Sequence, residues 1–245
     1  MNKTAIIIPS RLNALRLPNK PLELINKKEM ILHVYEAAKK TNTDDVYVAT
    51  PDQKIIDVIT NHGGKAILTS LDHQTGTDRV YEVFKNELKS DPSIIINLQG
   101  DMPNIESKAI SDLVLYMKKG LCDIGTLASK FISEAELADE NKVKVVVKEK
   151  IKTGNFSKAT DFFRTSSNTY ENIYHHIGIY AFTNKALVRY VSLERSKLEL
   201  KRKLEQLRAL ENNMSIHVGY INSSPLSVDT KSDLIEVKKL MENNE

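Results

Sequence analysis

The sequence has few of the residues and patterns that mark secreted, membrane-spanning or nucleic-acid-binding proteins. It contains one cysteine, Cys122, which cannot form an internal disulfide, and we find neither a signal-peptide pattern nor an apolar run long enough to cross a bilayer. Lys and Arg total 35 against 32 Asp and Glu, so the formal net charge is only +3. This balance argues against a general nucleic-acid or membrane partner. We therefore expect a cytoplasmic protein.

Two common phosphate-binding motifs are also missing. The chain contains neither G-x-x-x-x-G-K-[ST] nor G-x-G-x-x-G, so a P-loop NTPase and a Rossmann dehydrogenase are not supported. A chain of 245 residues with 41% hydrophobic residues is nevertheless long and apolar enough to bury a sizeable core. Because no repeat or low-complexity linker divides it, we expect one domain over 1–245.

The first half alternates short apolar runs with amphipathic segments, a pattern typical of a parallel sheet covered by helices. The expected strands are Ala5–Ile8, Val46–Ala49, Ala66–Leu68 and Ile94–Leu98. Helical spacing of apolar residues predicts a helix over Ile110–Met117, and Gly63, Gly64 and Gly120 occupy positions where helices end. We therefore expect an α/β fold with a mostly parallel sheet flanked by helices.

The second half has less helix between its apolar runs, which favours a mixed or antiparallel extension of the sheet. The expected strands are Ile124–Leu127, Val143–Val147, His176–Phe182 and Ile216–Val218. A stripe of Leu200, Leu204, Leu207 and Leu210 predicts one helix, and Asp233–Glu242 predicts the last one. The polar segment Glu149–Tyr174 lacks periodicity, and we interpret it as a mobile flap.

The loop after the first strand carries three cations, Arg11, Arg16 and Lys20, among several prolines. In an open α/β sheet, ligands bind beyond the carboxyl ends of the strands, which is where this loop begins. Arginine forks match phosphate oxygens in pairs and lysine acts as a mobile point charge, so the combination favours a polyphosphate. A solvated basic loop is the alternative interpretation.

Three later segments place polar residues at the same expected edge: Val48–Asp52, Leu71–Arg79 and Asn97–Pro103. In the second segment, Gly76 allows close backbone approach, Thr77 can cap the following helix, and Arg79 adds charge beside that helix start. This arrangement suits an anion or the edge of a base, although a plain helix cap would have the same sequence.

Two aspartates are candidate metal ligands. Asp101 comes directly after a buried strand, where a carboxylate needs a partner, and a divalent cation carried by a phosphate is a natural one. Asp229 is the second candidate metal ligand, although it precedes a helix and an N-cap is the alternative role. His73 and His176 are candidate general bases by residue type, although a lone histidine is more often structural.

Six blocks of the sequence, in order, resemble the 3-deoxy-manno-octulosonate (Kdo) cytidylyltransferase family, also called CMP-Kdo synthetases. They are Ile-Pro-Ser-Arg…Arg-Leu-Pro-x-Lys-Pro-Leu (8–22), Asp-His-Gln-Thr-Gly-Thr-Asp-Arg (72–79), Asn-Leu-Gln-Gly-Asp (97–101), His-Ile-Gly-Ile-Tyr (176–180), Leu-Glu-Gln-Leu-Arg (204–208) and Ser-Val-Asp-Thr (227–230). Each block is short, but together they span nearly the whole chain.

The resemblance implies a Rossmann-like nucleotidyltransferase fold and the reaction of CTP with Kdo to give CMP-Kdo and pyrophosphate, for lipopolysaccharide synthesis. It implies a CTP-binding half over 1–120, a sugar-acid-binding and dimerisation half over 121–245, a homodimer, and Mg²⁺ as cofactor. Asn19 stands where the family usually has Gly, and further departures fall at Lys158, Asp161, Lys197 and Arg202.

The resemblance also implies a role for each matching residue. It assigns catalysis to Arg16, Lys20, Asp101 and Asp229, the last two as Mg²⁺ ligands. The implied nucleotide site comprises Pro9, Ser10, Arg11, Arg16, Lys20, Ala49, Thr50, Thr75, Gly76, Thr77, Arg79 and Gln99, and the implied sugar-acid site comprises Gln99, His176, Tyr180, Glu205 and Gln206.

Two alternative functions stay open at this point. The departures on the acceptor side favour the same chemistry with another sugar acid, such as an amino-Kdo or a sialic-acid-like acceptor. A paralogue that binds nucleotide without catalysis is the second alternative, and the presence of Arg16, Lys20, Asp101 and Asp229 together argues against it.

Overall fold

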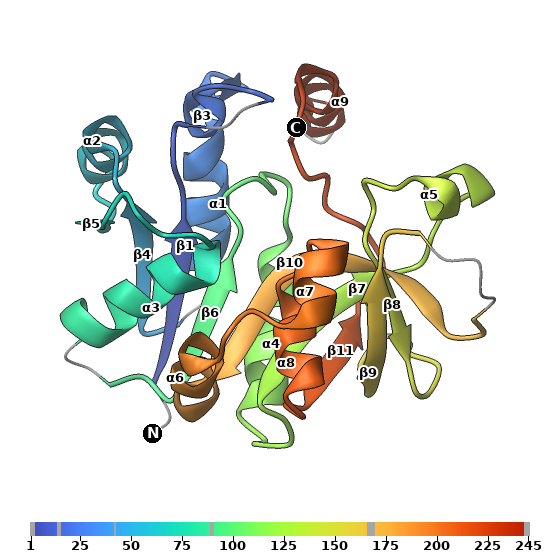
Figure 1. Cartoon of the computed structure of the whole chain (residues 1–245). Helices are drawn as coiled ribbons and strands as arrows, with labels where there is room; N and C mark the ends of the chain where they lie inside the picture. Colours follow the sequence, from blue (N-terminus) through green and yellow to red (C-terminus); the bar gives the residue numbers. More distant parts are fainter. Residues whose placement is uncertain (1–2, 14–15, 42, 89–90, 166–169, 243–245) are drawn as a thin grey trace. The chain divides into compact units, whose positions relative to one another are not determined.

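The computed structural model describes residues 3–13, 16–41, 43–88, 91–165 and 170–242 of the chain (Figure 1). These residues form two compact units, the first comprising 1–111 with 225–245 and the second comprising 112–224. Within the described residues, no helix is long and apolar enough to cross a membrane. The expected halves 1–120 and 121–245 differ from these units because the C-terminal segment returns to the first unit.

The first unit is built on parallel strands in the order β5-β4-β1-β6 (Figure 1). The bounds are β1 Thr4–Pro9, β4 Asp45–Thr50, β5 Ala66–Leu68 and β6 Ile94–Leu98. Every residue of β1 and of β6 is buried, as expected for central strands covered on both faces. The strands expected from the sequence are confirmed here, with small differences at the ends of β1 and β4.

Helices and short connecting elements surround these strands. They are η1 (Lys20–Leu22), β2 (Leu24–Ile25), β3 (Lys28–Glu29), α1 (Met30–Lys39), α2 (Gln53–Asn61), α3 (Gly76–Glu87) and α9 (Lys231–Glu242). The boundary between the units falls within α4 (Ser107–Met117). Helix α9 packs its buried Leu234 and Val237 with Ile25, Met30 and Val228. The last segment of the chain is thereby fixed to the first unit.

Glycine ends two of these helices as the sequence predicts. After α2, Gly63 has φ +71°, its N–H donates to the carbonyl of Thr60 and the N–H of Gly64 donates to the carbonyl of Ile59. This pair of bonds is the Schellman motif, which satisfies carbonyls that the helix leaves open. After α4, Gly120 likewise has φ +67°.

The second unit contains a mixed sheet in the order β10-β7-β11-β9-β8, and β8 also pairs with β10. The bounds are β7 Ile124–Ser129, β8 Lys144–Val147, β9 Phe156–Phe163, β10 Ile173–Thr183 and β11 Ile216–Tyr220. Only β7 and β11 pair in parallel among these neighbours. The expected mixed extension of the sheet is confirmed, and its strand pairing closes into a circuit.

The helices of this unit are α5 (Glu134–Ala138), α6 (Asn184–Ser192), α7 (Lys197–Arg202) and α8 (Gln206–Glu211). The prediction of one helix through Leu200, Leu204, Leu207 and Leu210 is wrong. Lys203 has φ +55°, a left-handed conformation that ends α7, and α8 begins three residues later. As a result Leu200 is 53% exposed, while Leu204 and Leu207 are buried.

The segment Glu149–Tyr174, which the sequence led us to interpret as a mobile flap, contains regular strands over part of its length. Strand β9 occupies Phe156–Phe163 and β10 begins at Ile173. The alternation of polar and apolar residues in β9 is interrupted by a register irregularity against β8 between Val146 and Val147, which weakens the sequence signal. Residues 166–169 of this segment lie outside the described residues.

Gly219 of β11 lies opposite Phe156 of β9, and the phenylalanine ring covers it. The same ring stacks on Tyr116 of α4, with centroids 3.6 Å apart and an interplanar angle of 5°. A Cβ atom at position 219 would lie 2.5 Å from Cε1 of Phe156, which is closer than carbon atoms approach. Glycine is therefore required here for space, as in other sheets where an aromatic ring covers a glycine.

We expect Gly219→Ala to lower the free energy of unfolding by about 1–3 kcal/mol, because the added methyl group overpacks this contact. Urea titration followed by circular dichroism measures the change. In a Phe156→Leu background the same substitution is expected to cost less, because the ring is absent. An equal loss in both backgrounds would show that the ring is not the cause.

Candidate functional site

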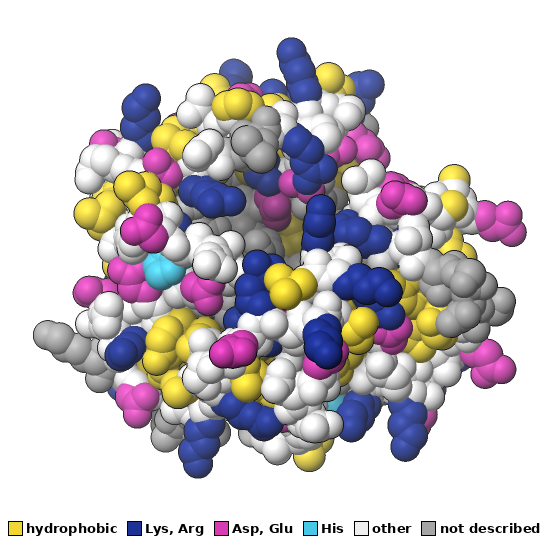
Figure 2. All heavy atoms as spheres, in the orientation of Figure 1, with side chains coloured by type: hydrophobic (Ala, Val, Ile, Leu, Met, Phe, Trp, Pro, Cys, Tyr) yellow, Lys and Arg dark blue, Asp and Glu magenta, His cyan; other side chains and the backbone are white. Residues whose placement is uncertain are grey.

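The first unit contains a cavity of about 570 Å³ at the carboxyl ends of its strands. It is lined by Pro9, Ser10, Arg11, Asn13, Arg16, Lys20, Pro21, His73, Gln74, Thr75, Gly76, Arg79, Gln99, Gly100, Asp101 and Asp229. The loop after β1 and two of the strand-end segments, Leu71–Arg79 and Asn97–Pro103, therefore meet at this cavity. Basic and acidic side chains are interspersed over the face shown in Figure 2, so the cations of the cavity are a local feature.

Backbone hydrogen bonds hold the loop after β1 in place. The N–H of Ser10 donates to the carbonyl of Ala49 (2.9 Å), and the N–H of Leu12 donates to a carboxylate oxygen of Asp52 (2.8 Å). Asn19 has φ +58°, and its N–H returns to the carbonyl of Leu12 (3.0 Å). Asparagine is one of the few residues that adopt this left-handed conformation readily, which accounts for Asn19 at a position where the family pattern has Gly.

Lys20 brings the two predicted metal ligands together. Its Nζ lies 3.0 Å from Asp101 Oδ2 and 3.3 Å from Asp229 Oδ1. Its side chain is 14% exposed, so the ammonium group is largely withdrawn from water. Arg16 contacts the other oxygen of Asp229 at 2.9 Å and is more exposed, at 58%. Residues from the N-terminal loop, the end of β6 and the C-terminal segment thus form one charge cluster.

Asp229 is not the N-cap of α9, which was its alternative role. Thr230 and Asp233 form a reciprocal cap at the start of α9, since each side chain accepts from the other's backbone N–H. The N–H of Val228 donates to the carbonyl of Asp101 at 2.9 Å, which holds the two segments side by side. The Asp229 carboxylate is therefore directed to Lys20 and Arg16.

A divalent cation fits this pair of carboxylates. Both already converge on one positive group, Lys20, and their hard oxygen donors are those that Mg²⁺ prefers. No cluster of three or more His, Cys, Asp or Glu residues suited to a metal occurs among the described residues. Mg²⁺ is commonly held by one or two carboxylates together with substrate phosphates and water, so two protein ligands are sufficient.

Helix α3 begins at the cavity. Thr75 is its N-cap, and Thr75 and Asp78 form a capping box, so the prediction that Thr77 caps this helix is wrong. Thr77 lies inside the helix and accepts a hydrogen bond from the Asn97 amide. A Cβ atom on Gly76 would approach Pro9 Cγ to 3.3 Å, so the helix start packs closely against the end of β1.

Arg79 and a histidine–glutamate pair organise the segment that precedes α3. Buried Arg79 donates to Thr69 Oγ1 and to the carbonyl of Ser70, and burial, with the nearby charge of Arg11 as a second cause, lowers the pKa of its guanidinium. His73 contacts Glu82 of α3, which also accepts from the N–H of Ser70. Nothing in the spacing of Glu82 distinguishes it from other helix glutamates, so its contact with His73 has no signal in the sequence.

Some predicted nucleotide-site residues lie behind the cavity rather than along it. Ala49 and Thr50 are fully buried and do not line it, and Thr77 is buried behind the helix start. Ala49 contributes by accepting the Ser10 hydrogen bond, and Thr50 accepts from the N–H of Asp52. Gln99 lines the cavity, and its amide donates to Asn97 Oδ1 at 3.1 Å.

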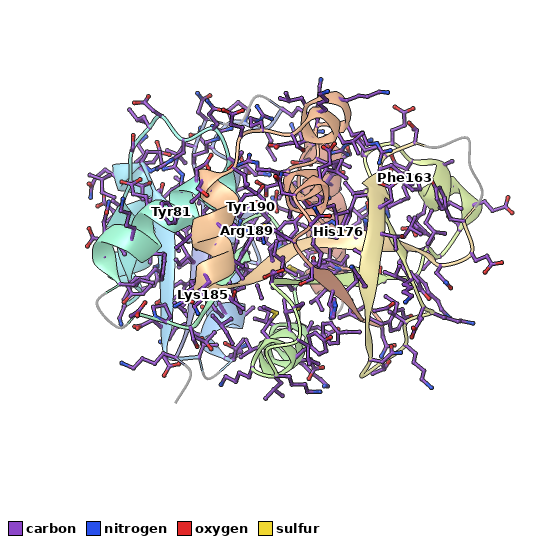
Figure 3. The ribbon with its side chains drawn as sticks, turned by 60° about the horizontal axis from the view of Figure 1, so that its bottom comes forward. Tyr81, Phe163, His176, Lys185, Arg189 and Tyr190 are labelled. Atoms are coloured by element: carbon purple, nitrogen blue, oxygen red, sulfur yellow. The ribbon has the colours of Figure 1, made fainter. Side chains whose placement is uncertain are left out.

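The predicted sugar-acid residues of the second unit lie close to one another. The rings of His176 and Tyr180 on β10 have centroids 5.4 Å apart. Burial raises the pKa of Tyr180 well above its ordinary value, and the charges of Glu205 and Tyr190 contribute. Tyr190 on α6 also donates from its hydroxyl to the carbonyl of Glu205 at 2.9 Å. Figure 3 labels His176 on β10 and Tyr190 on α6.

Gln206 lies on the buried side of α8, with an exposed fraction of 5%. Helix α8 starts after the break at Lys203, so its faces differ from those of one continuous helix. A buried ion pair between Arg208 of α8 and Glu199 of α7, 2.7 Å apart, sets the orientation of the two helices. Removing one partner would leave an uncompensated buried charge.

Two departures from the family pattern contact each other. Arg202 of α7 donates to Asp161 Oδ1 (2.5 Å) and to the carbonyl of Phe162 (2.8 Å), so they tie α7 to β9. Lys158 pairs with His217 in the sheet, and Lys197 begins α7 after its Ser196 cap. Asp161 and Arg202 therefore act as a structural pair.

Comparison with known proteins agrees with this geometry. A family model described as cytidylyltransferase matches residues 5–216. A 3-deoxy-manno-octulosonate cytidylyltransferase from Bartonella tribocorum is 41% identical, covering 96% of this chain and 97% of that protein. The enzyme of the same name from Brucella ovis is also 41% identical, covering 95% and 93%.

Solved structures give the same result. A CMP:2-keto-3-deoxy-manno-octonic acid synthetase in complex with CTP matches with a TM-score of 0.89 and 36% identity, over 99% of this chain and 100% of that one. The 4-diphosphocytidyl-2C-methyl-D-erythritol synthase from Anaerococcus prevotii, at 13% identity, shares the fold with a TM-score of 0.66 over 98% of each chain. The chain therefore belongs to the 3-deoxy-manno-octulosonate cytidylyltransferase family.

Proposed function

We propose that this protein transfers a cytidylyl group from CTP to Kdo, giving CMP-Kdo and pyrophosphate for lipopolysaccharide synthesis. The observation that carries the proposal is the charge cluster of Arg16, Lys20, Asp101 and Asp229 in the cavity of the first unit. A cluster of two cations and two carboxylates suits a nucleoside triphosphate that arrives with a divalent metal.

The cationic loop neutralises the triphosphate in this proposal. Arg11, Arg16 and Lys20 line the cavity, and CTP carries several negative charges that would otherwise repel an oxygen nucleophile. The cytidine would lie at the start of α3, where Thr75, Gly76 and Arg79 line the same cavity. Close packing of Gly76 on Pro9 leaves backbone groups, rather than a side chain, facing the base.

Asp101 and Asp229 would hold Mg²⁺ at the cavity. When bound, the ion supplies charge stabilisation for the phosphates and orients them for in-line displacement. Lys20 and Arg16 contact these carboxylates in the structure, so they are placed within reach of phosphate oxygens bound beside them. Arrangement of charge and position thus provides most of the acceleration, without a covalent enzyme intermediate.

The anomeric hydroxyl of the sugar acid attacks the α-phosphorus in this proposal, and pyrophosphate leaves. His176 is poorly suited to remove the hydroxyl proton, because burial lowers its pKa to about 3, with neighbouring His175 contributing. His73 is engaged with Glu82. We propose that neither histidine acts as a general base, and that lowering the charge of the bound nucleotide is the main means of activation.

In the second unit, the sugar acid would contact His176, Tyr180, Glu205 and Gln206, as the family resemblance implies. Glu205 and Gln206 combine a carboxylate with an amide, which together pair with several hydroxyl groups. By the same resemblance we propose a cytoplasmic homodimer that uses Mg²⁺.

The decisive test is pyrophosphate release from CTP with a panel of sugar acids. We expect the highest kcat/KM with Kdo, lower values with an amino-Kdo or a sialic acid, and a CMP-sugar product confirmed by mass spectrometry. Faster turnover of another sugar acid would move the assignment to that acceptor. If the protein binds CTP but releases no pyrophosphate with any of the acceptors, the interpretation as a catalytically inactive member of the family would be favoured.

Asp101→Asn and Asp229→Asn are each expected to lower kcat by more than ~100-fold, because loss of a direct ligand should exceed the effect of losing an outer-shell partner. Thermal denaturation checks that the fold is intact. Asp45→Asn is the matched control, since Asp45 pairs with Lys65 at 2.8 Å and does not line the cavity. Near-normal turnover in both site variants would refute the metal assignment.

Arg16→Gln and Lys20→Met should weaken binding of CTP much more than binding of CMP, by about 1.5–3 kcal/mol for each lost charged hydrogen bond. Isothermal titration with both nucleotides in the presence of Mg²⁺ measures the difference. Lys28→Met is the control, because Lys28 forms a similar pair with Glu36 away from the cavity. Equal losses for CTP and CMP would show that the loop does not contact the outer phosphates.

A further inference from the structure

The pairing of β10 with β7 contains an irregularity at the block His176–Tyr180. Ile177 pairs with Leu127 and Tyr180 pairs with Thr126, so β10 has two more residues than β7 across this step. Such bulges interrupt the ladder and re-aim side chains, often beside binding sites. At this bulge the carbonyl groups of Ile177 and Ile179 both lie within hydrogen-bond distance of the Thr126 hydroxyl.

Thr126 is fully buried opposite this bulge, and its hydroxyl faces three groups. Its Oγ1 lies 2.7 Å from the carbonyl oxygen of Ile179, 3.3 Å from that of Ile177 and 2.9 Å from Nε2 of His176. A hydroxyl group has one hydrogen to donate. Because carbonyl oxygens only accept, and the 2.7 Å contact has the length of a good O–H···O bond, that hydrogen goes to Ile179.

The direction of the hydrogen bond between Thr126 and His176 is then determined. The Thr126 oxygen must accept, so His176 Nε2 must carry the hydrogen and donate it. A neutral imidazole holds its hydrogen on one nitrogen, so Nδ1 then presents a lone pair. His176 is neutral because burial lowers its pKa to about 3. Phe162, with its ring edge-on at 5.1 Å, and Tyr180 restrict rotation of the imidazole.

Nδ1 of His176 is the remaining polar atom of this group. His176 is 7% exposed. Unlike the hydroxyl oxygen of Ser129, its Nδ1 is not a fully buried atom without a partner. The structure gives it no hydrogen-bond partner within the described chain, although Nε2 is satisfied. A nearly buried acceptor without a partner among the described residues is suited to a ligand that donates a hydrogen bond.

We infer that Thr126 is a positioning residue that fixes His176 as the Nε2–H tautomer, so that Nδ1 accepts a hydrogen bond from a hydroxyl group of the sugar acid. The inference rests on the proposed function for the identity of the ligand. In this inference Nδ1 of His176 only accepts a hydrogen bond. His176 therefore recognises a hydroxyl group and disfavours the carboxylate, which has no hydrogen to donate. Thr126 acts through His176 without contacting substrate.

The tautomer is measured directly by ¹⁵N–¹H NMR of protein labelled at its histidines, with the His176 signals identified from a His176→Asn variant. We expect a protonated Nε2 and an unprotonated Nδ1 in the free protein, and a shift of the Nδ1 resonance when Kdo is added with CMP and Mg²⁺. A protonated Nδ1 in the free protein would overturn the inference. An Nδ1 resonance unchanged by saturating Kdo would overturn the substrate contact.

Variants at position 126 test the positioning role in turnover. Thr126→Val removes the hydroxyl while keeping the shape, and we expect the KM for Kdo to rise about tenfold, with a smaller change in kcat and an unchanged Kd for CTP. Thr126→Ser retains the hydroxyl and should keep both the tautomer and the KM. Equal weakening of CTP and Kdo in the valine variant, or loss of the tautomer in the serine variant, would contradict the inference.

Ser129→Ala is the matched control, because Ser129 lies on the same strand, is 1% exposed, and has a buried hydroxyl without a partner among the described residues. It should leave the His176 tautomer and the KM for Kdo unchanged. If Thr126→Val does not fold, the wild-type and serine spectra still decide the tautomer. If the protein is inactive with Kdo, the proposed function fails. The spectrum of the free protein still shows whether Thr126 fixes the His176 tautomer, so the two failures are distinguishable.

Discussion

The first unit depends on one shared charge contact, in which Lys20 lies between the carboxylates of Asp101 and Asp229. Two acids at this spacing would repel each other, and a largely buried ammonium group offsets that repulsion. The contact joins three segments that are far apart in the sequence. Asn19, in its left-handed conformation, and the N–H bond from Val228 to Asp101 position the partners, so the surrounding backbone is arranged around this cation.

Under the proposed function, the same contact explains how a site for a highly charged nucleotide could exist in a protein with little net charge. Arg16 and Lys20 each contact a carboxylate in the cavity, so these charges are balanced locally. Binding of an anion with a divalent cation, as proposed, would exchange these pairs for others of the same kind and would not require burial of an uncompensated charge. Such an exchange keeps the site stable in both states.

The candidate residues of the second unit differ from the charged residues of the first, because they are buried and neutral. His176 and Tyr180 are both held in their uncharged forms by burial, and the bulge in β10 brings them together opposite Thr126. A neutral site distinguishes ligands by the direction of hydrogen bonds. The buried pair of Glu199 and Arg208 supports it from α7 and α8, where Glu205 and Gln206 begin the second helix.

The sequence by itself determined the strands of the first unit and the mixed character of the second, because these depend on local periodicity and residue type. It did not determine that α7 and α8 are separate, since a lysine with φ +55° has no sequence signature. Nor did it reveal Glu82, the bulge at His176 or the bond from Thr126, because those depend on partners distant in sequence. Which atom faces which is decided by tertiary packing, since hydrogen-bond polarity is fixed only when all neighbours are in place.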